Sequence, residues 1–446
     1  GFMKSRLMFL FGLVLMFAFV ASAQTTVYKY AFSKAFPDTG FKVANGAHGV
    51  AVDPDGKVWI VRYSDADSML VGSTYKATIP IRVYNANGTP ASFSPIRILT
   101  IKSVAETLYA GNNRGIARDK NGNIVVANNL ANPTRTGNLY RINYKTGAGI
   151  DKVSPQVASQ TQPAFDDLNE MFTANVSDGV GPIRIFDGSF SFLGNVVDTS
   201  RGFSRTLAVS KDGNDVYFGG FTNNKVTRYH SANGSLGPYS TIDTVMKGLT
   251  VECFGWHPKT GYLWAGGGNA TSGANLAPFT DYSFYAFKSP NFNTPVDSIK
   301  WSSANLLTND PRPRGIAFSN TGDTAYICAF NVSAEACVQM FVGKSQAAGV
   351  HREDGIVVSD YQLMQNYPNP FNPSTQIKFT VPSNVTVSLK VYDMLGKEVA
   401  TLVEGEFSAG SYTADMNGKN LSSGMYFYTL KTSNGFTQTK KMMLLK

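Results

Sequence analysis

The chain of 446 residues is 43% hydrophobic and only 16% charged, and it contains 42 Gly and 3 Cys. The apolar content is ample for packed cores and excludes global disorder, while the low charge argues against helical bundles and coiled coils. The formal charge of +9 is spread along the whole chain and is too dilute for a nucleic-acid-binding surface.

The first predicted element is a secretory leader. A basic start at Lys4 is followed by an uninterrupted apolar run over residues 7–20 and by Ala21-Ser22-Ala23, the small-x-small pattern of signal peptidase cleavage. Such a run is short for a membrane span, although an uncleaved anchor is the alternative. We expect a signal peptide over residues 1–23, a mature chain that starts at Gln24, and no membrane span after cleavage.

Five later segments share one pattern, in which an apolar run, a polar turn and a second apolar run follow one another. Each segment predicts two short strands joined by a tight turn, where a Gly supplies the positive φ. The segments are GVAVDPDGKVWIVRY from Gly49, GIARDKNGNIVVANN from Gly115, TLAVSKDGNDVYFGGF from Thr206, FGWHPKTGYLWAGGGN from Phe254 and GIAFSNTGDTAYICAFN from Gly315.

A sixth, degenerate copy is predicted at AFDDLNEMFTAN from Ala164, with Glu170 in place of the turn Gly. Each copy is followed by a third strand that carries Arg or an aromatic residue. First strands start 42 to 66 residues apart, which is close to the length of a four-stranded propeller blade with insertions. We expect a six-bladed β-propeller over residues 24–345, whose sixth blade is completed by an N-terminal strand at residues 27–32.

The repeat motif resembles that of a known superfamily. GVAVDPDGKVWI from Gly49 and GIARDKNGNIVV from Gly115 are similar to the G-I-A-x-D-x-x-G-N-x-x-V core of the NHL-repeat and SMP-30/gluconolactonase-like propellers. The resemblance covers residues 27–345, and it implies a fold rather than a function.

The propeller pattern stops before a second predicted domain. Residues 346–360 are expected to form a linker, and Pro residues are frequent just after it. Short alternating segments then predict a small immunoglobulin-like β-sandwich over residues 361–446, so that the whole chain is all-β. The expected strands are 376–381, 385–392, 398–403, 411–415, 425–431 and 436–445.

Motifs in this second domain resemble the type A C-terminal sorting domain of the type IX secretion system. They are YPNPF at 367–371, VYDMLGKEV from Val391, SSGMYFYTL from Ser422 and the terminal TKKMMLLK. The resemblance implies recognition by the type IX machinery of a Gram-negative bacterium, removal of the domain, and release or attachment to surface polysaccharide. An ordinary accessory module is the alternative. The implied sorting residues are Tyr367, Pro368, Asn369, Pro370, Phe371, Gly396, Gly424, Lys440 and Lys441.

Alignment of the repeats brings charged residues to one mouth of the predicted central channel. Arg offers a planar fork to carboxylates, and Asn can both donate and accept, so these residue types suit an oxygen-rich, anionic ligand such as a small acid or a polysaccharide. Bracing of loops by Arg and ordinary turn chemistry of Asn are the structural alternative. The candidate ligand-binding residues are His48, Arg114, Arg205, Glu252 and Arg314, with Asn128, Asn175, Asn223 and Asn269.

We expect a binding or scaffold module rather than an enzyme, and no cofactor or metal. The gluconolactonase resemblance would imply a divalent cation held by Glu, Asn and Asp, but Arg and His occupy most of the corresponding positions and would repel a metal ion. The other enzymatic alternative is a polysaccharide lyase with His48 or His230 as base.

The three Cys leave one odd thiol in an exported protein. Cys328 and Cys337 lie on apolar runs separated by a short turn, so they could face each other across a hairpin as a disulfide. Cys253 would then be buried without a disulfide. No paired spacing typical of a zinc site is present in the sequence.

Overall fold

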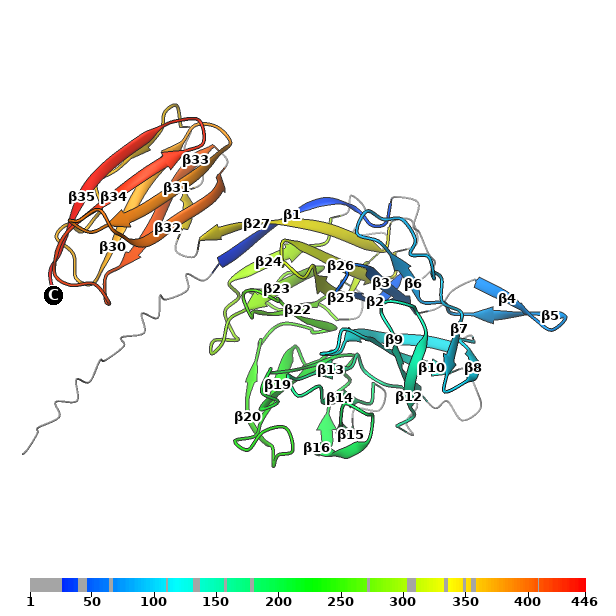
Figure 1. The fold of residues 1–446 in the computed structure, drawn as a ribbon. Coiled ribbons are helices and arrows are strands. Elements are labelled where there is room, and N and C mark those ends of the chain that lie inside the picture. The colour runs from blue at the N-terminus through cyan, green and yellow to red at the C-terminus, as the bar shows by residue number, and fades with distance from the viewer. Residues whose placement is uncertain are drawn as a thin grey trace, which may run out of the picture. The chain divides into compact units, whose positions relative to one another are not determined.

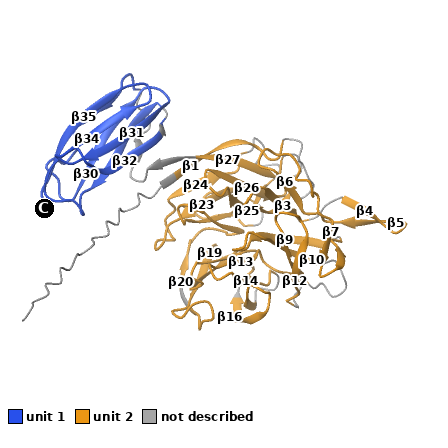
Figure 2. Ribbon diagram, in the orientation of Figure 1, with its two compact units in different colours: residues 1–26, 347–446 blue, residues 27–346 orange. Residues whose placement is uncertain are grey.

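The computed structural model divides the chain into two compact units, one formed by residues 27–346 and the other containing residues 347–446 (Figure 2). The all-β prediction is confirmed, because every described element is a strand. Within these described parts of the chain, no helix is long and apolar enough to cross a membrane. The structure describes residues 26–38, 46–63, 67–109, 111–130, 137–155, 159–176, 180–270, 273–302, 310–332, 336–347, 350–353, 358–407 and 409–446. The predicted leader over residues 1–23 lies outside this set.

The first unit contains six antiparallel sheets of three or four strands, which we number I to VI along the chain (Figure 1). Sheet I comprises β2 (Ala47–Val52), β3 (Val58–Arg62) and β6 (Arg82–Tyr84). Sheet II comprises β9 (Gly111–Arg118), β10 (Ile124–Leu130), β11 (Gly137–Ile142) and β12 (Gly149–Val153). Sheet III comprises β13 (Ala164–Phe165), β14 (Met171–Ala174), β15 (Val180–Phe186) and β16 (Phe192–Arg201).

Sheets IV to VI repeat the same order. Sheet IV comprises β17 (Leu207–Val209), β18 (Asp215–Gly220), β19 (Lys225–His230) and β20 (Ser240–Val245). Sheet V comprises β21 (Cys253–Trp256), β22 (Leu263–Gly267), β23 (Ser283–Phe287) and β24 (Asp297–Lys300). Sheet VI comprises β25 (Arg312–Phe318), β26 (Thr324–Phe330), β27 (Val338–Ala347) and β1 (Thr26–Ala35).

Two extra hairpins accompany sheet I. One is formed by β4 (Asp67–Val71) and β5 (Thr74–Thr78), which projects from the unit in Figure 1, and the other by β7 (Ile98–Ile101) and β8 (Val104–Thr107). Because β7 pairs with β8, it does not continue the ladder of sheet I, which therefore has three strands.

A polar side chain, buried in four of the six sheets, fixes each tight turn between the first and second strands. Asp53 accepts hydrogen bonds from the backbone N–H groups of Asp55 and Lys57, both at 2.9 Å, and from the indole N–H of Trp59 at 2.9 Å. Gly56 closes the turn at φ 82°, where an L side chain would be strained. The turn thus satisfies its own backbone groups and anchors a core tryptophan.

Equivalent turns follow the other first strands. Their capping residues accept from backbone N–H groups two to five residues downstream, and they are Asp119, Asp166, Ser210, His257 and Ser319. In the sixth copy the prediction of Glu170 at the turn position is wrong by one residue. Asn169 stands there at φ 67°, because Asn tolerates the left-handed region better than other non-Gly residues.

The innermost strands stand side by side around a central channel. β2 packs against both β9 and β25, so the first and last sheets meet and the ring is closed. Glycines permit this convergence, since a Cβ on Gly115 would lie 2.5 Å from the Cα of Gln162 and one on Gly315 would lie 3.0 Å from the backbone N of Val50. This arrangement is that of a β-propeller.

The N-terminal strand completes sheet VI, as predicted, in the order β1-β27-β26-β25. Backbone N–H of Phe36 donates to the carbonyl of Val338 at 3.0 Å, and the Tyr28 hydroxyl donates to the carbonyl of Thr321 at 3.1 Å. Lys29 also reaches Asp297 of sheet V at 3.0 Å. β1 therefore covers the outer edge of β27 and ties two sheets together.

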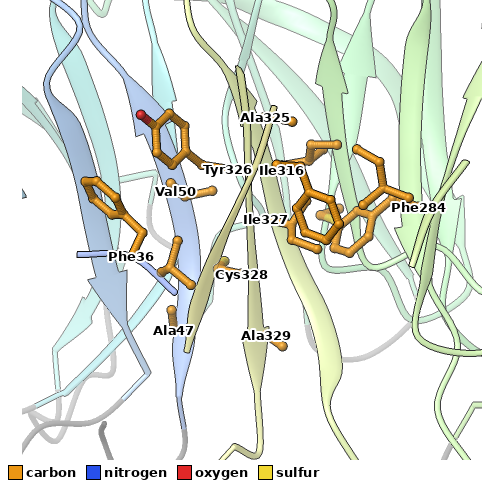
Figure 3. Packing of buried hydrophobic residues seen from close by; sticks show 14 of the residues in the cluster. Phe36, Ala47, Val50, Phe284, Ile316, Ala325, Tyr326, Ile327, Cys328 and Ala329 are labelled. Atoms are coloured by element: carbon orange, nitrogen blue, oxygen red, sulfur yellow. The ribbon is translucent and has the colours of Figure 1, made fainter. Parts of the chain in front are cut away.

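Sheet VI shares a continuous apolar core with both of its neighbours (Figure 3), to which sheet I contributes Val50 and sheet V contributes Phe284. The cysteine prediction is wrong here, because no disulfide joins Cys328 and Cys337. Cys328 is opposite Val338 in the ladder, and the N–H of Ala329 donates to the carbonyl of Cys337 at 3.1 Å. Since successive side chains alternate between the two faces of a sheet, this register directs the two cysteines to opposite faces.

The C-terminal unit consists of two four-stranded sheets around one apolar core. The first has the order β28 (Val350–Glu353), β33 (Gly410–Asn417), β30 (Ser374–Val381) and β29 (Gln362–Leu363). The second has the order β32 (Glu398–Phe407), β31 (Val385–Tyr392), β34 (Gly424–Thr432) and β35 (Thr437–Leu444). Residues 346–360, predicted as a linker, thus contain strand β28, which pairs with β33 of the sandwich.

Candidate functional site

A buried ionic cluster lies at the upstream end of the channel, by which we mean the end where the innermost strands begin. Glu252 precedes β21, and its side chain is fully buried. Its Oε2 atom pairs with Nε of Arg205 at 3.0 Å and with Nη1 of Arg314, so one carboxylate serves arginines from sheets IV and VI. The backbone N–H of Glu252 donates to the carbonyl of Gly266 at 2.8 Å, which fixes its position.

His48 belongs to the same cluster. Its Nε2 accepts from Nε of Arg314 at 3.2 Å, and its ring lies 5.0 Å from that of Tyr63 and 5.4 Å from that of Phe330, measured between centroids. Burial and the Arg314 guanidinium hold the pKa of His48 well below its usual range. His48 is therefore neutral and acts as a hydrogen-bond acceptor for an arginine.

Aromatic rings cover the arginines, and these rings were not among the predicted site residues. The Arg205 guanidinium packs against both Phe203 and Phe221, at 5.0 and 4.8 Å from the ring centroids. Arg114 lies 4.8 Å from the centroid of Tyr63, and Arg314 lies 5.4 Å from that of Phe330. The sequence does contain the signal, because Tyr63, Phe221 and Phe330 each end the second apolar run of a repeat.

The cluster carries more positive than negative charge. Arg114, Arg205 and Arg314 contribute +3 and Glu252 contributes −1, which leaves +2 beside a neutral His48. Burial, and then the charge of neighbouring Arg312, lowers the pKa of Arg205 to about 10. Burial and the nearby Arg205 likewise lower the pKa of Arg114. These shifts show guanidinium groups that repel one another in a partly dry environment.

Arg114 is the cation of this cluster that Glu252 does not neutralise. Within the described residues its Nε atom is buried and has no hydrogen-bond partner, and no carboxylate lies within ion-pair distance. A buried guanidinium in this state is costly unless an anion or water meets it. Arg114 is thus a cation without a counter-charge among the described residues.

The predicted asparagines contribute less directly. The Nδ2 of Asn128 donates to Oδ1 of Asn113 at 2.8 Å inside sheet II, and Asn223 is an exposed turn residue that accepts from Thr222. The neighbouring Asn224, not Asn223, bridges sheets, since it donates to Thr250 at 2.9 Å. Asn175 is half-buried at the end of β14, and the buried Asn269 donates its backbone N–H to Gly273 at 3.1 Å.

The donor set does not fit a divalent cation. Metals such as Ca²⁺ require several carboxylate or carbonyl oxygens, whereas the single carboxylate of this cluster is engaged by two arginines. Over the residues whose positions are described, no group of three or more His, Cys, Asp or Glu side chains could hold a metal ion. His230, the other candidate base, lies in β19 and pairs with Asp215 at 2.9 Å.

The downstream end of the channel, where the innermost strands end, is different in character. It holds a cavity of about 210 Å³ lined by all six innermost segments, including Ala51, Ala117, Leu207 and Phe318. Its one charged lining residue is Arg118, whose Nη1 donates to the carbonyl of Val52 at 3.2 Å and to the Asn320 side chain. The six turn caps surround this end.

The predicted sorting residues occupy the rim of the sandwich. Tyr367 is 82% exposed, whereas Phe371 is 2% exposed and its N–H donates to the carbonyl of Met443 at 2.9 Å. The Asn369 side chain accepts from the N–H of Met443 at 2.9 Å, so the motif is bonded to the last strand. Gly396 forms a turn at φ 81°, and Gly424 begins β34. Lys440 and Lys441 lie in β35, opposite Tyr428 and Phe427.

Comparisons with solved structures show distant likeness to several propellers. The chain resembles the WD40 beta propeller domain of Doa1, with a TM-score of 0.41 and 12% identity over 71% of this chain and 97% of that one. It also resembles the Dos1 propeller, with a TM-score of 0.40 and 11% identity over 70% of this chain and 95% of that one. A luciferin-regenerating enzyme is similar with a TM-score of 0.43 and 11% identity over 68% of this chain and 92% of that one. These values carry no argument about function.

Sequence comparisons identify the C-terminal unit. No curated protein matches the chain. Residues 365–445, however, match the family model described as "Secretion system C-terminal sorting domain". The match indicates that the chain carries a type IX secretion sorting domain behind a β-propeller and is exported to the cell surface or the extracellular space.

Proposed function

We propose that this exported propeller is a binding module that takes an anionic ligand, a small acid or an acidic surface polysaccharide, at the upstream end of its channel. In this proposal each of the six sheets is one blade, and the repeat motif places the fold near the NHL and SMP-30-like propellers. The N-terminal leader is removed before Gln24, and the immunoglobulin-like sorting domain is removed after it has engaged the type IX machinery.

One observation supports the proposal most strongly: a cluster of three arginines contains one carboxylate, which pairs with only two of them. Glu252 pairs with Arg205 and Arg314, and Arg114 remains without a carboxylate among the described residues. A carboxylate ligand would accept hydrogen bonds from the Arg114 fork, and the Tyr63 ring beneath it would hold the guanidinium in place. Nothing in the cluster supplies a free base, because Arg314 occupies the Nε2 of His48.

A binding screen with matched variants tests the site. The full chain is presented to a glycan array and to a panel of small carboxylic acids, beside Arg114→Met and Arg118→Met. Both positions lie in β9, but Arg118 is at the downstream end of the channel. We expect Arg114→Met to weaken anion binding about tenfold or more, as for loss of a charge-assisted hydrogen bond, while Arg118→Met leaves it unchanged.

Two results would overturn the proposed function. Equal binding by wild type and Arg114→Met would remove the site from the upstream end. Turnover of a lactone that is abolished by a chelator would show that the propeller is a metal-dependent enzyme instead of an anion-binding module.

The processing part of the proposal is tested by the intact mass of the secreted protein. The mass should correspond to a start at Gln24 and to loss of roughly the C-terminal 80 to 90 residues, the length of the sorting domain. Secretion of a protein that still contains residues 365–445 would show that the domain is retained.

A further inference from the structure

A second pocket lies away from the channel, between sheets II and III. It has a volume of about 350 Å³ and is lined by Val153 and Pro155 from the end of β12 and by Arg184, Phe186 and Phe192 from sheet III. Phe190, in the turn between β15 and β16, forms a further part of the wall. Pockets of this size are at the lower end of those that hold small organic ligands.

Among the described residues, the arginine of this pocket has no anionic partner. Arg184 lies in β15 opposite Thr173 of β14, and its Nη1 atom is buried without a hydrogen-bond partner among the described residues. Burial lowers the pKa of Arg184, and no carboxylate among the described residues offsets this shift. A desolvated guanidinium is costly when nothing accepts from it.

Arginines in the third strands of three other sheets have carboxylate partners, although Arg141 and Arg228 are one residue out of register with Arg184 and so lie on the opposite face. By its register with the first and second strands, Arg82 of sheet I is the equivalent of Arg184, and Arg82 lies 3.9 Å from Oδ2 of Asp67. Arg141, in the third strand of sheet II, pairs with Asp119 at 3.2 Å. Arg228 in sheet IV pairs with Asp243 at 3.3 Å. Within the described residues, Arg184 alone of these four has no carboxylate within 4 Å.

Aromatic rings form the rest of the pocket. Phe186 and Phe192 meet edge to face with their centroids 5.6 Å apart. Phe190 is buried, and Arg141 covers it at 3.9 Å from the ring centroid, which holds this wall in place. Phe192 is 57% exposed, so its ring is accessible to a ligand in the pocket.

The carboxylate nearest in sequence does not compete for Arg184. Asp187 begins the turn after β15, and its Oδ1 atom accepts from the backbone N–H groups of Ser189 and Ser191, both at 2.8 Å. This carboxylate is therefore used in closing its own turn, as Asp53 is in sheet I.

From this geometry we propose that the pocket between sheets II and III binds a small aromatic carboxylate, with the carboxylate on Arg184 and the ring among Phe186, Phe190 and Phe192. A planar guanidinium matches a single carboxylate with two parallel hydrogen bonds. A phosphate group, with its higher charge, would need more than one cation in the pocket. A neutral aromatic molecule would leave Nη1 of Arg184 without a hydrogen-bond acceptor. The proposal is independent of the channel site, because none of its residues contributes to the cluster around Glu252.

Calorimetric titration of the full chain tests the pocket, with benzoate, 3-phenylpropanoate and the neutral 3-phenylpropan-1-ol as probes. We expect an acid to bind about tenfold or more tightly than the alcohol, because only the acid satisfies Arg184. Arg184→Met should abolish this preference, and Phe192→Ser, at an exposed position, should weaken acid and alcohol alike. Arg228→Met controls for loss of a third-strand arginine, and Arg114→Met separates this pocket from the channel.

Several outcomes would overturn the inference. They are binding of neither acid, equal binding of acid and alcohol, or unchanged binding by Arg184→Met. Loss of acid binding in Arg114→Met but not in Arg184→Met would assign the acid to the channel. The thermal midpoints of all variants are measured beside the titrations, so that a loss caused by unfolding is recognised as such.

Discussion

The two ends of the propeller channel use polar side chains in opposite ways. At the downstream end each cap bonds to its own turn, as Asp53 does with Asp55 and Lys57. At the upstream end Glu252 receives arginines from two other sheets. Polar groups are satisfied locally at one end and by long-range pairing at the other.

This difference indicates which end of the channel has polar groups that could bind a ligand. A cap whose hydrogen bonds close its own turn is explained by the fold. A cluster with an excess of charge is not explained by folding, because burying an unneutralised guanidinium is unfavourable. The excess of +2 at the upstream end, with Arg114 outside the ion pairs of Glu252, therefore points to a ligand.

The largest expected effect follows from removing the central carboxylate. Glu252→Gln keeps the side-chain volume but leaves Arg205 and Arg314 facing each other without a counter-charge. We expect a loss of about 3–5 kcal/mol in the free energy of unfolding, as for breaking a buried ion pair. Asp243→Asn, at an exposed pair with Arg228, is the control and should cost less than about 1 kcal/mol. Similar losses in chemical denaturation would contradict the long-range role of Glu252.

A downstream cap should be the next most sensitive position. Asp53→Ala leaves two backbone N–H groups and the Trp59 indole without their acceptor, and we expect a loss of about 2–4 kcal/mol. Asp55→Ala, in the same turn but exposed, should change stability by less than about 0.5 kcal/mol. Anion binding upstream should be unaffected by Asp53→Ala as long as the protein is folded, and a selective loss would break the distinction between the two ends.

The cap of sheet III should make stability depend on pH. Burial raises the pKa of Asp166 from 3.8 to about 7, and a hydrogen bond with Glu170 also favours the protonated form. The folded state therefore binds a proton that the unfolded state releases near pH 4, and stability should fall as the pH rises from about 4 to about 7. Unfolding free energies measured across this range should show the slope in wild type and a flatter profile in Asp166→Asn. Identical pH profiles of wild type and Asp166→Asn would contradict the assignment of this pH dependence to Asp166.

The smallest effect on stability is expected at the proposed contact residue itself. Arg114→Met removes a cation that no carboxylate of the described residues neutralises, while it keeps an apolar chain against Tyr63. We expect the free energy of unfolding to change by less than about 1 kcal/mol, in either direction. A loss as large as that of Glu252→Gln, measured by denaturation, would show that Arg114 is structural.

Much of the fold could be predicted from the sequence because the repeats encode local structure. The hairpins around Gly56 and Gly322 have the turns that the sequence implies, and β1 joins sheet VI as expected. Two of the errors are single-residue errors of register. Asn169 rather than Glu170 takes the turn position, and the alternation of side chains separates Cys328 from Cys337.

The candidate site was predicted only in part, for a physical reason. Alignment of repeats brings Arg205, Glu252 and Arg314 to one level of the channel, but it cannot state which charges pair, because the pairs join different sheets. The aromatic residues that pack on the arginines stand at the ends of the second apolar runs in the sequence, but this position alone does not predict a contact with arginine. The pocket at Arg184 depends on the lack of a carboxylate partner among the described residues around it, which a single sequence does not express.

The most direct test of the central claim is the dissociation constant of the tightest-binding acid from the screen, measured for wild type, Arg114→Met and Arg118→Met at low and high salt. An anion site at the upstream end predicts that Arg114→Met binds about tenfold or more weakly, that Arg118→Met binds as wild type does, and that salt weakens wild-type binding. Equal weakening by both substitutions, or binding that is insensitive to both salt and Arg114→Met, would contradict the claim.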